Sequence, residues 1–231
     1  MSNDKYIWDF LLLEYKNMYG VAALMGNLYV ESKLKSVYLQ SSYARKLGMT
    51  SEEYTIAVDD GSYDNFVHDS AGYGLAQWTY WSRKQALYDY CKQHNKSIGN
   101  LDAQLDYLIK ELSSYKTVVE AIKNASSVRE ASDIIAKKYE RPADQSEKAL
   151  ANRASFGTKF YEKYATEDIK KVVILTDKVN IRCGNGKEYS RILLSYKDKE
   201  YPYIATAENG WYAVALSDRV GWVSSEFSKI K

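Results

Sequence analysis

The hydrophobic pattern of this 231-residue chain changes once, near residue 166. Upstream of that point, apolar residues recur at every third or fourth position, as they do along the buried face of an α-helix. Downstream, short runs of β-branched and aromatic residues alternate with Gly, Asn and Asp turns, which is typical of a small barrel or sandwich. The sequence therefore predicts two domains: an α-helical domain over residues 1–165 and a small all-β barrel over residues 166–231.

The same periods predict the individual elements. We expect helices at residues 4–18, 20–31, 36–48, 51–57, 81–94, 101–112, 117–123, 128–139 and 145–164. We expect strands at residues 171–176, 191–196, 201–207, 211–216 and 220–225. The segment Asp59–Thr79 has no regular period and is rich in Asp and Gly. A polar loop of this length inside a compact domain is more often functional than not.

One carboxylate stands at an unusual place in the helical part. The stretch Gly20–Lys35 is apolar at helical spacing, and Glu31 arrives where that apolar run ends. At the C-terminal end of a buried helix, the helix dipole and the loss of hydration both raise the pKa of a carboxyl group. Such a group can act as a general acid. The alternative is that Glu31 is simply the first solvated residue after a core helix.

Composition argues against several classes of function. The formal net charge of +2 is too small to indicate a nucleic-acid partner. No apolar stretch approaches the roughly 20 residues that cross a bilayer, so we expect no membrane insertion. With only His68 and His94, a metal set is not credible, and we expect no metal and no cofactor. Cys91 and Cys183 lie in different predicted domains, which predicts free thiols.

Three motifs in the helical part point to a family when they are considered together. They are GNLYVESKL at Gly26–Leu34, GYGLAQWTYWSR at Gly72–Arg83 and YERP at Tyr139–Pro142. In this order and spacing they resemble the phage tail-tip lysozyme and endolysin family, whose relatives include goose-type lysozymes and soluble lytic transglycosylases. The resemblance covers about residues 5–165 and implies a lysozyme-like fold for the helical domain.

The resemblance also implies roles for individual residues. Glu31 becomes the general acid that protonates the glycosidic oxygen between N-acetylmuramic acid and N-acetylglucosamine, as glycoside hydrolysis requires. Further residues would bind or orient the substrate: Ser32 beside Glu31, Tyr73 and Trp78 by stacking on sugar faces, Gln77 through its amide, and Tyr139 by a hydrogen bond near Glu31. The alternative for these residues is burial alone, because a buried Tyr or Trp needs no ligand to explain it.

A second carboxylate is harder to assign. An inverting hydrolase needs a general base across the cleft, about 6.5–9.5 Å from the acid. Asp69 is the first candidate because it precedes the Gly-rich motif, followed by Asp60, Asp64 and Asp59. Each of these residues is also a plausible turn-former or helix cap. Without a base, internal attack by the muramyl 6-hydroxyl would make the protein a lytic transglycosylase.

The β-rich part resembles a bacterial SH3-like cell-wall-binding domain. The residues that carry the resemblance are Val179–Arg182, Asn209–Tyr212 and Gly221–Val223. The chain has Cys183–Gly186 where that family usually has Gly-Pro, so the turn after Arg182 differs. The expected ligand residues are Tyr189, Tyr201, Tyr203 and Trp211. The alternative is that Trp211 and Trp222 fill the core of the barrel.

The sequence as a whole therefore predicts a peptidoglycan hydrolase, an endolysin-type muramidase with bacterial peptidoglycan as its partner. The N-terminal residues MSNDKYIWDFLLLEY lack the features of a secretory signal. We expect the protein to accumulate in the host cytoplasm and reach the wall through a holin, or to travel on a phage tail. Two alternatives stay open: a lytic transglycosylase, and a non-catalytic wall-binding or tail structural protein. The oligomeric state stays open as well.

Overall fold

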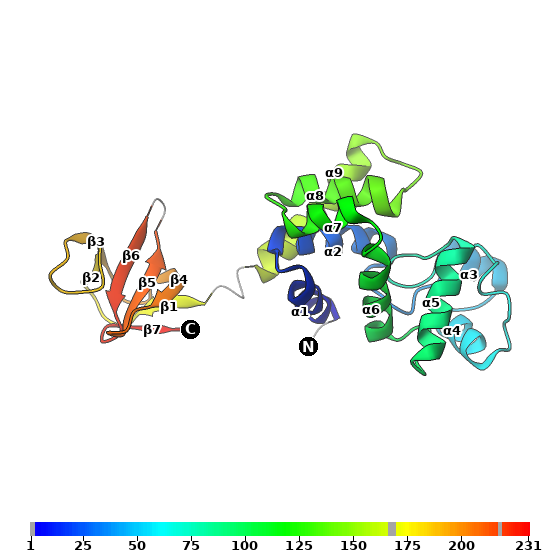
Figure 1. Cartoon of the computed structure of the whole chain (residues 1–231), viewed down its shortest axis with the longest axis horizontal. Helices are drawn as coiled ribbons and strands as arrows, with labels where there is room; N and C mark the ends of the chain where they lie inside the picture. Colours follow the sequence, from blue (N-terminus) through cyan, green and yellow to red (C-terminus); the bar gives the residue numbers. More distant parts are fainter. Residues whose placement is uncertain (1–2, 166–169, 217–218) are drawn as a thin grey trace. The chain divides into compact units, whose positions relative to one another are not determined.

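The computed structural model describes residues 3–165, 170–216 and 219–231. Residue contacts divide the chain into two compact units, Met1–Tyr164 and Ala165–Lys231 (Figure 1). The first unit is helical and the second is built from antiparallel strands, so the predicted fold class is confirmed. No helix within the described ranges has the length and apolar character needed to cross a membrane.

The helices lie close to the predicted positions. In the described residues they are α1 Asn3–Tyr15, α2 Met18–Ser32, α3 Ser41–Leu47, α4 Ser51–Asp60, α5 Trp81–Gln93, α6 Leu101–Leu112, α7 Lys116–Lys123, α8 Val128–Ile135 and α9 Glu147–Tyr164. One difference is chemically important. The helix expected at residues 128–139 changes to a π-helical turn, η1 Ala136–Glu140, and ends where Arg141 takes a left-handed backbone conformation with φ +49°.

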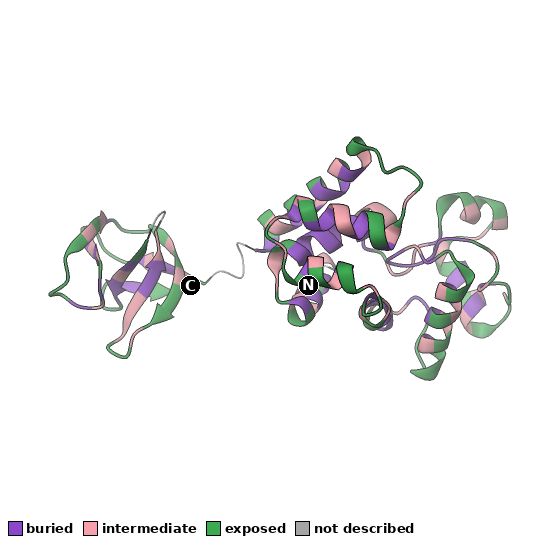
Figure 2. Cartoon of the chain, turned by 45° about the horizontal axis from the view of Figure 1, so that its top comes forward, coloured by how far each residue is buried: buried purple, intermediate pink, exposed green. Residues whose placement is uncertain are grey.

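Helix α2 is the centre of the helical unit. Its residues from Gly20 to Leu28 are buried, and it packs against α8 and α9 (Figures 1 and 2). The Asn17 side chain caps its first turn by accepting from the Gly20 amide at 3.0 Å. At the other end, Lys33 takes a left-handed conformation and its N–H donates to the Tyr29 carbonyl. Helix α2 therefore ends immediately after Glu31 and Ser32.

Glycines allow the backbones of α2 and α9 to meet. A Cβ atom on Gly26 would lie 2.5 Å from both the Arg153 carbonyl oxygen and the Gly157 nitrogen. A Cβ atom on Gly157 would lie 2.9 Å from the Ala22 carbonyl oxygen. Because backbone atoms cannot move aside as a flexible side chain can, these contacts admit only glycine. They set the distance between α2, which carries Glu31, and α9, which carries Arg153.

The second unit is a small antiparallel sheet. Its described strands are β1 Lys171–Ile174, β2 Val179–Arg182, β3 Arg191–Ser195, β4 Glu200–Thr206, β5 Trp211–Ala215, β6 Val220–Ser224 and β7 Ser228–Ile230, in the order β3-β2-β6-β5-β4-β1-β7. The strand pattern predicted neither β2 nor β7. Strand β2 coincides with the Val179–Arg182 segment that carries the resemblance, and β7 pairs with β1. Six aliphatic side chains form the core: Val172, Ile174, Val179, Ile181, Val214 and Val223. Trp211 and Trp222 are only half-buried.

The Gly26 contact can be tested by one added methyl group. We expect Gly26→Ala to lower the free energy of unfolding of the helical unit by about 3 kcal/mol or more, because the new Cβ meets backbone atoms. Gly61→Ala is the control, since its Cβ would meet nothing within 4 Å and only the φ of +83° is unfavourable. We expect that control to cost about 1 kcal/mol. Urea unfolding followed by far-UV circular dichroism measures both, and equal costs would contradict the assignment.

Candidate active site

A polar pocket of about 510 Å³ lies beside the C-terminal end of α2. Residues from α2, α5, η1, α9 and the segments around residues 40 and 72–80 line it. They are Glu31, Gln40, Gly72, Ala76, Gln77, Thr79, Tyr80, Arg83, Glu140, Arg141, Pro142 and Arg153. The pocket thus brings together residues of all three sequence motifs. It contains two carboxyl groups, from Glu31 and Glu140.

Glu31 is held by an arginine from α9. The Arg153 guanidinium donates to Glu31 Oε1 at 2.7 Å, with Glu31 21% exposed and Arg153 6% exposed. Arg153 also contacts the buried Asn27 Oδ1 at 3.4 Å. Asn27 in turn donates to Ser132 Oγ of α8 at 3.0 Å. The Glu31 side chain is therefore fixed by a chain of contacts that joins α2, α8 and α9.

Glu140 has a different environment. It is the last residue of η1, and its Oε1 atom is buried with no hydrogen-bond partner among the described residues. Burial is the main reason why the pKa of Glu140 is raised to about 8, and the nearby Glu31 raises it further. Arg83 and Arg153 act in the opposite direction without cancelling the effect. Burial therefore favours the protonated form of Glu140 at neutral pH.

Glu111 of α6 anchors the other side of the pocket. Arg83 donates to both of its oxygens, at 2.7 and 2.9 Å. The Trp78 indole and the Tyr139 hydroxyl donate to Glu111 Oε2 at 2.9 and 2.6 Å. Burial disfavours the charged form of Glu111, but these donors, with Arg83 the strongest, hold its pKa below the ordinary value. An ionised Glu111 fixes Arg83 at the pocket wall.

The structure places the predicted substrate-binding residues in two groups. Gln77 lines the pocket, and its Nε2 donates to the carbonyls of Tyr38 and Gly74 at 3.2 and 3.1 Å. The others are buried against protein atoms rather than turned toward the pocket. They are Ser32, whose hydroxyl donates to the Leu75 carbonyl, Tyr73, which shares a hydrogen bond with Thr55, and Trp78 and Tyr139, which both donate to Glu111.

Asp69 does not reach the pocket in the described structure. Its side chain is 4% exposed and pairs with the fully buried Lys84 at 2.5 Å. The hydroxyls of Tyr54 and Tyr63 also donate to it. Asp69 thus serves as the counter-ion of Lys84, and this arrangement does not favour its predicted role as a base. The other candidates lie elsewhere: Asp59 accepts from the Ile98 amide, Asp60 from the Ser62 amide, and Asp64 lines a separate pocket with His68.

The sequence motifs did not identify Glu140, Arg83 or Arg153 as site residues. Glu140 belongs to the motif Tyr139–Pro142, and Arg83 is the last residue of the motif Gly72–Arg83. Arg153 had no local signal, because it belongs to the helical pattern of α9 and meets Glu31 from 122 positions away. The described residues contain no group of three or more His, Cys, Asp or Glu side chains that would hold a metal ion.

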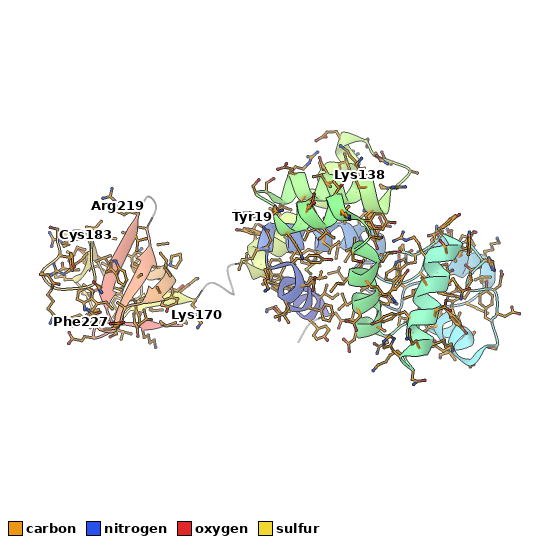
Figure 3. All side chains as sticks on the ribbon, in the orientation of Figure 1. Tyr19, Lys138, Lys170, Cys183, Arg219 and Phe227 are labelled. Atoms are coloured by element: carbon orange, nitrogen blue, oxygen red, sulfur yellow. The ribbon has the colours of Figure 1, made fainter. Side chains whose placement is uncertain are left out.

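The β-rich unit has a pocket of its own, of about 310 Å³. Its lining combines two aromatic side chains, Trp211 and Phe227, with three cations, Lys178, Arg182 and Lys187, and one carboxylate, Asp177; Figure 3 labels Phe227. Of the four predicted ligand residues, only Trp211 belongs to this lining. The others lie apart from it: Tyr189 packs over Gly184, Tyr201 shares a hydrogen bond with Ser195 at 2.9 Å, and Tyr203 packs on Tyr212 and on the core.

Comparison with known proteins identifies the helical unit. The family model described as phage tail lysozyme matches residues 2–164. The chain belongs to the phage tail lysozyme family. The match ends at residue 164, so the β-rich unit lies outside the part that defines this family.

A curated protein supports the connection with phages. Morphogenesis protein 1 of Bacillus phage B103 is 22% identical over 219 residues, which cover 89% of this chain and 53% of that protein. The chain therefore spans about half the length of this relative. The resemblance of residues 166–231 to an SH3-like domain stays a prediction.

Replacing Asp69 separates a structural role from a catalytic one. Asp69→Asn leaves Lys84 buried without a counter-ion, so we expect the free energy of unfolding to fall by about 3 kcal/mol or more. Below its melting temperature, the folded variant should retain the activity of the wild type. Asp64→Asn is the control, since Asp64 is exposed in the same loop. Thermal melts and wall lysis measure both variants, and lost lysis at unchanged stability would restore Asp69 as a base.

Proposed function

We propose that the helical unit cleaves the glycosidic bond between N-acetylmuramic acid and N-acetylglucosamine in peptidoglycan, with Glu31 as the general acid. One observation carries the proposal: Glu31 ends the buried helix α2 at a polar pocket that a second carboxyl group, Glu140, also lines. Membership of the phage tail lysozyme family supports the same reaction class.

The arrangement suits glycoside cleavage. The reaction needs a proton delivered to the leaving oxygen and negative charge near the positively charged carbon of the transition state. Glu31 is fixed by Arg153 and is 21% exposed, so its carboxyl is both oriented and accessible to a sugar. Gln77 lines the same pocket, and because its Nε2 donates to backbone carbonyls, its Oε1 is the atom left to accept from a polar group of the substrate. Its side chain is held by two backbone carbonyls, which reduces the entropy lost on binding.

The β-rich unit would act as the wall anchor. Its pocket combines Trp211 with the cations Lys178, Arg182 and Lys187, a set suited to a ligand that has both an apolar part and a negative charge. Tethering the enzyme to an insoluble polymer raises the effective concentration of cleavable bonds. The expected partner is bacterial peptidoglycan, reached through a holin or from a phage tail.

A second candidate is a structural role in the phage particle without catalysis. The similarity to a phage morphogenesis protein is the observation that favours it. A structural protein could have the same helical fold, but it would not need Arg153 to orient Glu31 at a pocket. The two functions differ in one readout, the release of sugar products from purified walls.

Glu31→Gln tests the assignment of the acid. Glutamine keeps the shape of the side chain but has no acidic proton, so we expect lysis of purified walls to fall by about 100-fold or more while wall binding is kept. Mass spectrometry of the wild-type products then distinguishes the chemistry. Reducing muramic acid ends indicate a hydrolase, and anhydromuramic ends indicate a lytic transglycosylase.

Glu147→Gln is the matched control, because Glu147 is 79% exposed at the start of α9, outside the pocket. We expect it to lyse walls like the wild type. Unchanged lysis by Glu31→Gln would refute Glu31 as the acid. No sugar products from the wild type would favour the structural role.

The anchor is tested in the full chain with Trp211→Ala. Removing the indole from the pocket of the β-rich unit should weaken sedimentation with purified walls by about 10-fold, since one buried aromatic contact contributes about 1–2 kcal/mol to binding. Tyr196→Ala is the control, because Tyr196 is 49% exposed and outside that pocket. Both variants should keep their circular dichroism spectra. Equal wall binding by the two variants would argue against this pocket as the anchor.

A further inference from the structure

Apart from the exposed Arg141, the charged groups around Glu140 do not balance unless one carboxyl group keeps a proton. The groups that act most strongly on Glu140 are Glu31 from α2, Arg83 from α5, Glu111 from α6 and Arg153 from α9. Together with Glu140, these make three carboxyl groups against two guanidinium groups. Fully ionised, the cluster would hold one negative charge in excess, and burial makes such a charge costly.

The contacts show which carboxyl is in excess. Glu111 takes both hydrogen bonds of Arg83, and Glu31 takes the hydrogen bond of Arg153. Glu140 is left without a cationic partner, and its buried Oε1 is unbonded within the described ranges. A neutral carboxyl group is far less costly than a carboxylate at such a position.

The remaining charges near η1 do not supply a partner for Glu140. Arg141, the next residue, is exposed and donates to the Lys138 carbonyl; Figure 3 labels Lys138 at this end of the unit. Lys137 and Lys138 are exposed on η1 itself. Helices α7 and α8 pack against η1, and their charged residues do not face Glu140. On α8, Arg129 pairs with Asp133 and Glu147, and Glu130 lines another pocket. The charged residues of α7 line pockets away from the active site: Lys116, Glu120 and Lys123.

We propose that Glu31 and Glu140 hold a single proton between them, and that Glu140 is the positioning residue that keeps this proton in the pocket at neutral pH. This proposal rests on the function proposed above, and it explains how Glu31 can carry a proton although it is paired with an arginine. Glu31 is paired with the Arg153 guanidinium, whereas a general acid must carry a proton when it acts. A second carboxyl group in the same pocket resolves this conflict, because two neighbouring carboxylates cannot both ionise at low cost.

With this pair, the protons and electrons of the reaction balance. The shared proton passes from Glu31 to the glycosidic oxygen, and the electrons of the bond between the anomeric carbon and that oxygen go to the leaving oxygen. Both carboxyl groups are then negative beside the positively charged anomeric carbon, which stabilises the transition state. A new bond forms from the anomeric carbon to the oxygen of water or of the muramyl 6-hydroxyl. The proton released by that nucleophile returns to the pair, so either product leaves the site ready for another cycle.

The first test uses the full chain and needs no activity. Glutamate residues are labelled with ¹³C at the side-chain carboxyl carbon, and their chemical shifts are followed from pH 4 to pH 10. We expect one carboxyl resonance with a midpoint near pH 8, because the pKa of Glu140 is raised to about 8. This resonance should be absent from Glu140→Gln. In Glu31→Gln its midpoint should fall by about one pH unit or more, since the neighbouring charge is gone.

The second test is the pH profile of wall cleavage. In Glu140→Gln the second carboxyl group of the pocket can no longer hold a proton, so the pair loses the proton that it keeps up to about pH 8. We expect the alkaline limb of kcat/KM to move down by at least about one pH unit, with the larger loss of activity at pH 8 than at pH 5. Glu147→Gln is the control and should keep the wild-type profile.

Several results would overturn the proposal. If no glutamate carboxyl resonance of the wild type has a midpoint above pH 6, the proposal is wrong. This result does not require either variant to fold. An unchanged midpoint in Glu31→Gln would show that the two groups do not share a proton. An alkaline limb that does not move in Glu140→Gln would show that Glu140 has only a structural role. Because the titration does not depend on lysis, an inactive protein with a normal high titration would refute the proposed function and leave the proton pair standing.

Discussion

The close contact between α2 and α9 is the constraint on which the rest of the helical unit depends. Gly26 and Gly157 bring the two backbones together, and this approach places the Arg153 guanidinium 2.7 Å from Glu31. A helix pair held apart by larger side chains would leave the partly buried Glu31 carboxylate without its counter-ion, at a cost in stability. The packing of the core and the orientation of the proposed acid thus have the same physical origin, a pair of helices that meet without side chains between them.

The buried charged residues of the helical unit form groups with different roles. Lys84 and Asp69 form a closed pair with tyrosine hydroxyls around it, and this pair supports the loop that carries the Gly-rich motif. Glu111 gathers Arg83, Trp78 and Tyr139, and so gives one wall of the pocket a fixed shape. Among the residues that the structure describes, the Glu140 carboxyl group has a buried oxygen without a hydrogen-bond partner. Structural ion pairs are satisfied by their neighbours, whereas a functional group is often left unsatisfied until substrate arrives.

In the β-rich unit, the sequence pattern predicts most of the strands but not which aromatic side chains line the pocket. The strand pattern correctly indicated a small all-β unit, because alternation of apolar residues depends only on which side of a sheet is buried. The same pattern could not tell which aromatic residues remain accessible. Tyr189 packs over Gly184 and stays exposed, Tyr203 packs on a neighbouring ring, and Trp211 alone of the predicted set lines the pocket.

The sequence alone determined the order of a helical and an all-β region, most helix limits, and the nomination of Glu31 at the end of a buried helix. These are local properties, set by hydrophobic period and by capping residues such as Asn17. Only the tertiary structure decided that Asp69 neutralises Lys84, that Trp78 and Tyr139 hold Glu111, and that Glu140 shares a pocket with Glu31. The physical reason is that the environment of a charge depends on groups far away in sequence, as Arg153 and Glu31 show, and no local pattern records that distance.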